Sequence, residues 1–202
     1  MAKSDLNLSR RVNFAETVDI LLNSGDNAVH LMGEPGVGKT AMHNEIVART
    51  GYKGIYIDGP NTDVGQSGMP IPNHDSRTLD FYPSGAYGLH LNEPLCIMID
   101  EWTKTDDYVR NTLHPLLHER RLGNFKLHPD SIVFTTGNMD ADGVGDSSKA
   151  HTRNRQTWLT YMKPTAKEWC NWATNNGIAP EVIAWVHEYE HCMASYMDGG
   201  QE

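Results

Sequence analysis

Long apolar runs are missing from this chain of 202 residues. No stretch approaches the roughly 20 consecutive apolar residues that a membrane-spanning helix needs, and the first residues lack the apolar core of a signal peptide. Cysteine is scarce, with three residues at irregular spacing, as is usual for proteins kept in a reducing compartment. We therefore expect a cytoplasmic protein with free thiols and no membrane partner.

Positive charge is also in short supply. The chain has 17 Lys and Arg against 26 Asp and Glu, which gives a formal net charge of −9. Such a chain is poorly suited to non-specific binding of a phosphate backbone. Nucleic acid is therefore not indicated as the main partner, although a local basic channel inside an assembly is compatible with the sequence. The length suits one domain, or one domain with a small appendage.

The sequence contains one complete phosphate-binding motif. It matches G-x-x-x-x-G-K-[ST] at every fixed position, and its residues are Gly33, Glu34, Pro35, Gly36, Val37, Gly38, Lys39 and Thr40. The glycines let the backbone turn its amides toward an anion, Lys39 supplies a charge for the β- and γ-phosphates, and the Thr40 hydroxyl can ligate Mg²⁺. A short apolar strand pattern precedes the motif and a helical pattern follows it, which is the context that a nucleotide-binding loop requires.

Polar residues also follow two other strand patterns. Asp100 and Glu101 end one of them, and Asn138 ends the next. Because ligands bind at the carboxyl ends of the strands in parallel sheets, we expect Asp100 to hold Mg²⁺ opposite Thr40. Glu101 is the candidate general base that polarises the attacking water. The amide of Asn138 can hold that water or the γ-phosphate, although Asn is also common in turns.

Strand and helix patterns alternate along the chain, which predicts a parallel α/β sheet covered on both faces. Continuous apolar runs are typical of strands that are buried on both faces. Region 59–90 is rich in Gly, Pro, Asn and Ser, and we expect loops there with a short hairpin or helix. The expected strands are 28–32, 54–58, 95–99, 131–136 and 157–162, with a hairpin at 123–127, and the expected helices are 13–22, 39–50, 107–121, 165–175 and 180–197.

The order of the motifs resembles that of a known family. The phosphate loop, Ile99-Asp100-Glu101-Trp102, Phe134-Thr135-Thr136-Gly137-Asn138 and Arg153-Asn154-Arg155 stand in the order Walker A, Walker B, sensor 1 and arginine finger. Over most of its length the chain is similar to a bacterial or phage-encoded AAA+ ATPase of the MoxR-like type, in the group that includes CbbQ, NorQ, dynein and midasin. The resemblance implies that Glu101 is the catalytic glutamate and Asn138 is sensor 1. Either Arg155, the better match, or Arg153 is the finger that acts on a neighbour's ATP.

The same resemblance implies an architecture and an activity. It implies a P-loop three-layer sandwich with strand order 5-1-4-3-2 in residues 1–163, and a small, truncated helical lid in residues 164–202. The activity is Mg-dependent ATP hydrolysis coupled to remodelling of a partner protein or assembly. The chain is expected to form a homo-oligomeric ring, a hexamer, and to act on a protein that carries a von Willebrand factor A domain in some systems. No arginine follows Arg155, so the usual sensor 2 charge is absent and basal hydrolysis is expected to be weak.

Other nucleotide-binding classes fit the sequence less well. The N-K-x-D signature of GTPases and the L-S-G-G-Q-type signature of ABC ATPases are absent. A small-molecule kinase of the P-loop class stays open, although it needs neither Glu101 nor an arginine from a neighbour. A nucleotide-gated binding module that hydrolyses ATP poorly is a further alternative.

Two other features have competing interpretations. His187-Glu188-Tyr189-Glu190-His191 fits H-E-x-x-H, and on one helix its histidines would share a face as zinc sites require. Ten His in the chain make a chance match more common than usual. In the glycine-rich stretch 64–90, Tyr82 and Tyr87 are either aromatic loop tips that grip a partner in a ring pore or ordinary packed tyrosines.

Overall fold

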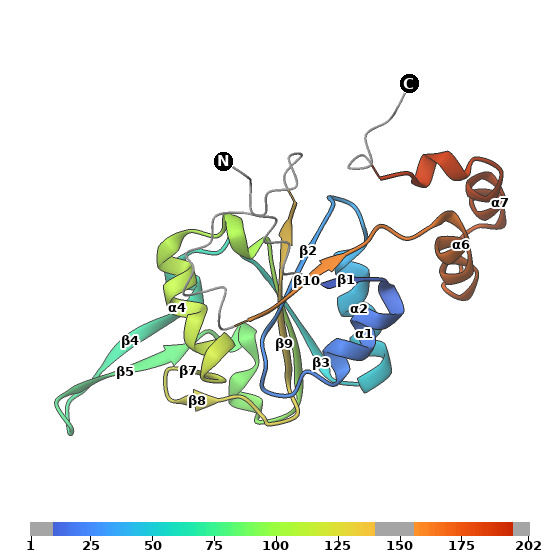
Figure 1. Cartoon of the computed structure of the whole chain (residues 1–202). Helices are drawn as coiled ribbons and strands as arrows, with labels where there is room; N and C mark the ends of the chain where they lie inside the picture. The colour runs from blue at the N-terminus through green and yellow to red at the C-terminus, as the bar shows by residue number, and fades with distance from the viewer. Residues whose placement is uncertain (1–9, 140–155, 196–202) are drawn as a thin grey trace, which may run out of the picture.

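A parallel sheet forms the centre of the molecule (Figure 1). The computed structural model describes residues 10–139 and 156–195, and these contain a six-stranded sheet whose paired strands are all parallel. Its strands in spatial order are β1 (Arg10–Val12), β10 (Thr157–Tyr161), β2 (Val29–Gly33), β9 (Ile132–Asn138), β6 (Leu95–Asp100) and β3 (Lys53–Asp58). The order from β10 to β3 confirms the predicted 5-1-4-3-2, and β1 adds an edge strand that the sequence did not predict.

Helices cover both faces of this sheet, which confirms the three-layer α/β class. Figure 1 shows α1 (Phe14–Leu22) and α2 (Lys39–Thr50) on one side and α4 (Asp107–His118) on the other. Alternate residues of β6 enter different core clusters. Cys96 and Met98 pack with residues of α1 and α2, whereas Ile97 and Ile99 pack with residues of α4. This explains the unbroken apolar run, because both faces of β6 are buried.

A long hairpin projects from the body of the molecule (Figure 1). It consists of β4 (Gly68–Asn73) and β5 (Thr78–Pro83), after the short helix α3 (Val64–Ser67); a hairpin in region 59–90 was expected, but it is longer than predicted. A second hairpin, β7 (Arg121–Leu122) with β8 (Phe125–Lys126), follows α4. Single turns η1 (Gly85–Tyr87), η2 (Leu89–Leu91) and η3 (Trp102–Lys104) lie before and after β6.

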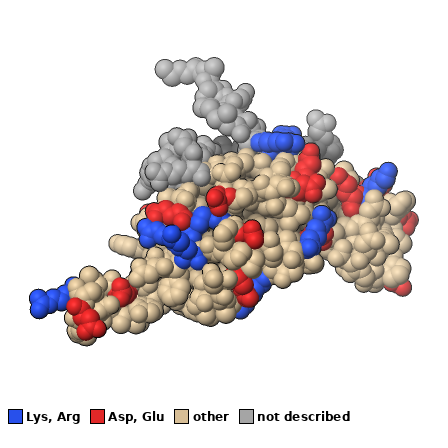
Figure 2. Space-filling view, turned by 90° about the horizontal axis from the view of Figure 1, so that it is seen from below, with Lys and Arg blue, Asp and Glu red and all other residues tan. Residues whose placement is uncertain are grey.

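The hairpin is held to the body by one of its faces. Phe81 packs against the core cluster on the α4 side. A Cβ at Gly123, in the turn between β7 and β8, would lie 2.5 Å from the Phe81 carbonyl oxygen, so the two hairpins touch closely. Figure 2 shows charged side chains gathered at the far end of the projection and largely uncharged surface between that end and the body. The hairpin is therefore a fixed arm rather than a loose loop.

The C-terminal helical region comprises α6 (Ala166–Asn175), α7 (Pro180–Glu188) and η4 (Glu190–Met193). It has its own small cluster of Ala166, Cys170 and Val186, with Trp169, Ile183 and Met193 packed around it. The predicted helix 180–197 is wrong in extent, since α7 ends at Glu188 and η4 is a separate turn. The proposed division at residues 163 and 164 stays a prediction.

The structure distinguishes the two interpretations of the tyrosines in region 64–90. Tyr87 is 5% exposed and its hydroxyl donates to Ser67 Oγ at 3.3 Å, so it is a packed tyrosine and not a loop tip. Tyr82 is 49% exposed, but it lies within β5 and pairs with Met69 near the base of the hairpin, so it is not a loop tip either. Within the described ranges, no helix has the length and apolar character to span a bilayer.

Candidate functional site

The phosphate loop connects β2 to α2 and curls over the carboxyl end of the sheet. Gly38 has φ +97° at the start of α2, a conformation that favours glycine. Gly33 ends β2, where a Cβ would lie 3.0 Å from the Tyr161 carbonyl oxygen of the neighbouring strand. These two glycines are therefore required by backbone geometry and by close strand packing, respectively. The loop that results directs amides of the first turn of α2 toward a bound anion.

Lys39 lies inside this loop and is only 8% exposed. Its ammonium group donates to the carbonyl oxygens of Gly33 and Glu34 at 3.1 and 3.0 Å, and to Asn138 Oδ1 at 2.7 Å. Burial lowers the pKa of Lys39 to about 8, against the opposing effect of the Asp100 and Glu101 carboxylates. A buried cation whose partners are mostly neutral oxygens is suited to an incoming phosphate.

Asp100 ends β6 and is held by donors on both carboxylate oxygens. Oδ1 accepts from the Thr136 hydroxyl and from the Glu101 amide, the latter at 3.1 Å, and Oδ2 accepts from the Tyr56 hydroxyl at 2.9 Å. Partial burial and the bond to Asp100 raise the pKa of Tyr56 to about 12, so the phenol stays a donor. Tyr56 was not predicted as a site residue, because on its own strand it looks like an ordinary β-sheet residue.

Glu101 follows directly and has φ +49°, which is unusual for a residue other than glycine. Its Oε1 accepts from Asn138 Nδ2 at 2.8 Å, and its Oε2 pairs with Lys104 Nζ at 2.8 Å. Asn138 therefore bridges Lys39 and Glu101, with its oxygen on one and its nitrogen on the other. The structure places the predicted residues Lys39, Glu101 and Asn138 in one continuous hydrogen-bonded chain.

The oxygen groups of this edge fit a magnesium ion. The hydroxyl of Thr40 belongs to an exposed residue at the start of α2, and Asp100 provides a carboxylate at the end of β6. Hydroxyl and carboxylate oxygens are the ligands that Mg²⁺ prefers, together with water and phosphate oxygens. Because both Asp100 oxygens already accept protein donors, this carboxylate is better suited to hold a metal-bound water than to enclose the ion. No cluster of three or more His, Cys, Asp or Glu suited to a metal occurs among the described residues.

A cavity of about 620 Å³ opens beside the phosphate loop. It lies between the start of α1, the loop itself, the end of β10 and α6, and its aromatic lining is Phe14, Tyr161, Trp169 and Trp172. Neither Lys39 nor the polar residues at the ends of β6 and β9 line it. No local sequence pattern predicts this cavity, because its walls come from four segments that are distant in the chain.

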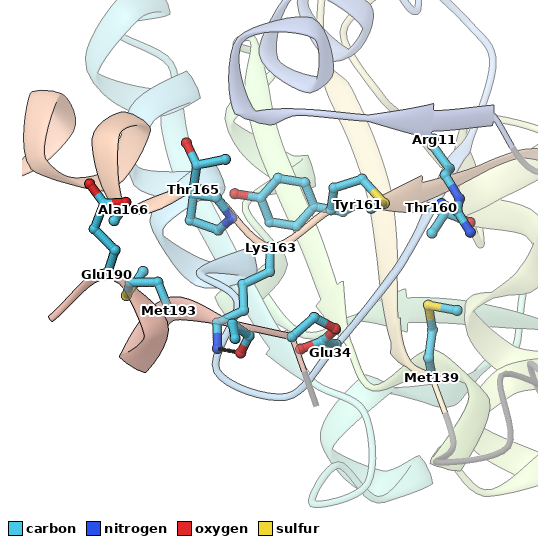
Figure 3. Close-up of a pocket in the computed structure, with 14 residues that line it drawn as sticks. Arg11, Glu34, Met139, Thr160, Tyr161, Lys163, Thr165, Ala166, Glu190 and Met193 are labelled. Carbon is cyan, nitrogen blue, oxygen red and sulfur yellow. Dashed lines mark hydrogen bonds between the residues drawn. The ribbon is translucent and has the colours of Figure 1, made fainter. Parts of the chain in front are cut away.

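A second cavity, of about 390 Å³, is lined by residues that include Arg11, Glu34, Tyr161 and Lys163 (Figure 3). The carboxylate of Glu34 accepts from the Ser195 hydroxyl, and Lys163 Nζ donates to the Ala194 carbonyl at 2.8 Å. These two bonds tie the end of the C-terminal helical region to the phosphate loop and to the end of the sheet. Lys163, the residue directly before the lid sequence, therefore lies beside the nucleotide loop.

The predicted arginine fingers and the H-E-x-x-H segment differ in what the structure says of them. Arg153 and Arg155, the candidate arginine fingers, lie outside the described residues. The H-E-x-x-H segment is described up to His191, and it does not form one helix, because α7 ends at Glu188 and His191 lies in η4. The shared helical face that a zinc site would need is therefore absent from this segment.

Comparisons with known proteins identify the family of this chain. Residues 28–155, more than half of the chain, match the family described as AAA domain (dynein-related subfamily). A candidate ATPase from Cytophaga hutchinsonii is similar in structure, with 16% identity and a TM-score of 0.49 over 72% of this chain and 45% of that one. The Thermotoga maritima RuvB Holliday junction branch migration motor is similar at 16% identity and a TM-score of 0.49, over 78% of this chain and 47% of that one. The chain thus spans less than half the length of either structure. A search of curated proteins finds no match.

Proposed function

The chain belongs to the dynein-related subfamily of AAA domains and is an ATPase, and from this premise we propose that it uses ATP hydrolysis to remodel a partner protein or assembly. The observation that carries the proposal is the chain of contacts from Lys39 through Asn138 to Glu101. It links the group that binds phosphate to the group that activates water. Such a link is what an enzyme needs to couple the presence of ATP to the start of hydrolysis.

The phosphates of ATP enter the loop next to Lys39. Its present partners are two carbonyl oxygens and the Asn138 amide oxygen, and phosphate oxygens are stronger acceptors for an ammonium group. Thr40 and Asp100 would hold Mg²⁺, which supplies charge neutralisation for the phosphates when bound. The base and ribose enter the aromatic cavity beside the loop, where flat apolar side chains suit a purine.

Hydrolysis requires Glu101 to accept a proton from water. Both of its carboxylate oxygens have protein partners, Asn138 for one and Lys104 for the other. When Lys39 and Asn138 turn toward a γ-phosphate, the Asn138 bond to Glu101 is released and one oxygen becomes available to water. In this proposal, the contact with Asn138 shields the base until a γ-phosphate draws Asn138 away.

The hairpin arm of β4 and β5 is the proposed contact with the partner. The pairs Met69–Tyr82 and Ile71–Asp80 lie on the same face of the arm, opposite the Phe81 face that holds it to the body. The three apolar residues of this face are exposed: Met69 to 61%, Tyr82 to 49% and Ile71 to 45%. Exposed apolar side chains that are not needed to hold the arm are typical of a binding surface.

We further propose a homo-oligomeric ring, a hexamer, of the MoxR-like type. The family resemblance supports it, as does the position of Arg153 and Arg155 after sensor 1 in the sequence. In this arrangement Arg155 acts on the ATP of a neighbouring subunit. A partner with a von Willebrand factor A domain belongs to the same proposal.

One experiment tests the coupling to a partner. Glu101→Gln should bind ATP without turnover and hold its partner, which is then isolated with ATP present and identified by mass spectrometry. The same variant with Met69→Ser and Tyr82→Ser should lose that protein while ATP affinity and thermal midpoint are kept. Retention of the same protein at equal yield would rule out the hairpin arm as the contact.

A second experiment tests the ring. Mixing Arg155→Ala subunits with Lys39→Ala subunits should restore part of the ATPase activity, because each subunit supplies what its neighbour lacks. Sedimentation with ATP confirms that the mixed subunits assemble. Absence of rescue with either Arg155→Ala or Arg153→Ala, in assembled protein, argues against catalysis between subunits.

A further inference from the structure

Tyr161 is a buried tyrosine whose hydroxyl has no protein partner in the described part of the chain. The residue is 3% exposed and its ring packs in the core cluster on the α1 and α2 side of the sheet. The hydroxyl oxygen itself is not fully enclosed, so a molecule in the cavity that this residue lines can reach it. Tyr87 is the useful contrast, because it is equally buried and its hydroxyl donates to Ser67.

The backbone of Tyr161 is held firmly in place. It is the last residue of β10 and pairs with Gly33 of β2 on one side and with Val12 of β1 on the other. Gly33 is the first residue of the phosphate loop and packs directly on the Tyr161 carbonyl and Cβ. A side chain on a strand that is paired on both sides has its position set before any ligand arrives.

The hydroxyl lies beside the phosphate loop, in the wall of the 620 Å³ cavity. A Cβ built on Gly38 would lie 4.0 Å from the Tyr161 hydroxyl oxygen. Figure 3 shows the hydroxyl end of Tyr161 directed toward Thr165 and Ala166, away from Arg11 and Met139. Ala166 is the first residue of α6, whose residues Trp169 and Trp172 line the same 620 Å³ cavity as Tyr161.

We propose that the Tyr161 hydroxyl is a nucleotide-binding group, which hydrogen-bonds to the nucleoside part of ATP in the aromatic cavity. The inference rests on the ATP site proposed above and adds a residue to it. The cavity is at the nucleoside end of that site, because Lys39 and the polar residues at the ends of β6 and β9 are not part of its wall. The nucleoside offers ribose hydroxyls and purine ring nitrogens as acceptors, and the phosphates lie farther along the loop.

The hydroxyl is a donor throughout the physiological range. Burial, and to a smaller degree the Glu168 carboxylate, raise the pKa of Tyr161 to about 12. A protonated phenol can donate to a ribose oxygen or a ring nitrogen and can also accept from a ribose hydroxyl. Replacement by phenylalanine removes this one oxygen and keeps the ring that packs in the core.

The test is calorimetric titration of Tyr161→Phe with ATP, ADP and inorganic tripolyphosphate. The dissociation constants for ATP and ADP should rise by about 3- to 10-fold, as expected for one lost hydrogen bond. The constant for tripolyphosphate, which has no nucleoside, should stay unchanged. Tyr87→Phe is the matched control, since it removes an equally buried hydroxyl away from the loop and should leave all three constants unchanged.

Each result of these titrations either supports or overturns the role of Tyr161. Unchanged ATP affinity in Tyr161→Phe overturns the inference, and so does an equal loss for tripolyphosphate, which would mean a distorted loop. The thermal midpoint without nucleotide should stay the same in Tyr161→Phe, because no protein partner loses a bond. If Lys39→Ala leaves ATP affinity unchanged, the ATP site itself is wrong. If Lys39→Ala abolishes binding and Tyr161→Phe has no effect, only the role of Tyr161 is wrong.

The ligand group can be identified with 2′-deoxy-ATP. If the 2′-hydroxyl is the partner, wild-type protein should bind 2′-deoxy-ATP about 3- to 10-fold less tightly than ATP, and Tyr161→Phe should bind the two equally. If Tyr161→Phe loses the same factor with both nucleotides, the partner is another ribose atom or the purine. Both results support a nucleoside contact.

Discussion

The carboxyl edge of the sheet and the hairpin arm are built in opposite ways. At the edge, Lys39 makes three hydrogen bonds while nearly buried, and Asp100 uses both carboxylate oxygens. On the arm, the apolar residues Met69 and Tyr82 are 61% and 49% exposed. Buried polar groups that are fully paired hold an exact geometry for chemistry, whereas exposed apolar groups can meet a partner of variable shape. The difference indicates that ATP chemistry and partner contact are separable by mutation.

Removal of the Lys39 charge should give the largest effect at the edge. Lys39→Ala should weaken ATP binding by about 100-fold or more, because several charge-assisted bonds to phosphate are lost at once. Lys53→Ala is a matched control at the exposed start of β3 and should bind ATP normally. Calorimetric titration measures both, and equal affinity of the two variants would contradict the phosphate-loop role.

Replacement of the base should separate binding from turnover. Glu101→Gln should lower the ATPase rate by about 100-fold or more, since an amide cannot accept the proton of water. The Gln oxygen can still accept from Asn138, so ATP affinity should change by no more than about threefold. Glu93→Gln, at an exposed position before β6, is the control. A steady-state rate near that of the wild type in Glu101→Gln would exclude the general-base role and favour a kinase-like use of the site.

The pH dependence of ATP binding should report the buried state of Lys39. Its pKa is lowered to about 8 in the folded protein, so the free protein loses this charge as pH rises through 8. Bound phosphate favours the charged form, and ATP binding above pH 8 must therefore take up a proton. The dissociation constant should rise about tenfold between pH 7 and pH 9. Calorimetry in buffers of different ionisation enthalpy measures the proton uptake, and a flat profile would contradict the lowered pKa.

The same shift has a consequence for stability in the absence of nucleotide. Between pH 8 and the ordinary lysine pKa, the unfolded chain binds more protons at this position than the folded chain. The contribution of Lys39 to the free energy of unfolding therefore rises with pH over that window. Denaturant titrations of wild type and Lys39→Met at pH 7 and pH 9.5 isolate this contribution to the free energy of unfolding, because the methionine variant lacks the titrating group.

The arm should show the smallest effects on the protein itself. Met69→Ser and Tyr82→Ser should change the free energy of unfolding by less than about 1 kcal/mol, as is usual for exposed positions. Phe81→Ala, on the opposite face, should cost about 2–3 kcal/mol because it removes a packed aromatic ring. Thermal unfolding and basal ATPase measure both variants. A large loss of stability in the serine variants would mean that this face is part of the fold.

Local patterns were sufficient for much of this protein. The phosphate loop, the strand ends at Asp100 and Asn138 and the parallel sheet were predictable, because each depends on residues that are neighbours in sequence. The sheet then brought the strand ends together, since parallel strands share one carboxyl edge. The local sequence pattern does not predict the different exposure of Tyr82 and Tyr87. Both belong to one glycine-rich stretch, but only the fold decides that one is exposed and the other is buried.

Tertiary structure alone decided the contacts that cross the chain. Tyr56 reaches Asp100 from another strand, and Glu34 reaches Ser195 from 161 residues away. The aromatic cavity joins Phe14 of α1, Tyr161 of β10 and Trp169 of α6. No periodicity in the sequence predicts such contacts between distant segments, because they depend on how the helices and strands pack after each has formed. The sequence by itself therefore determined which chemistry the loop carries, and the packing of distant segments determined the surroundings in which that chemistry takes place.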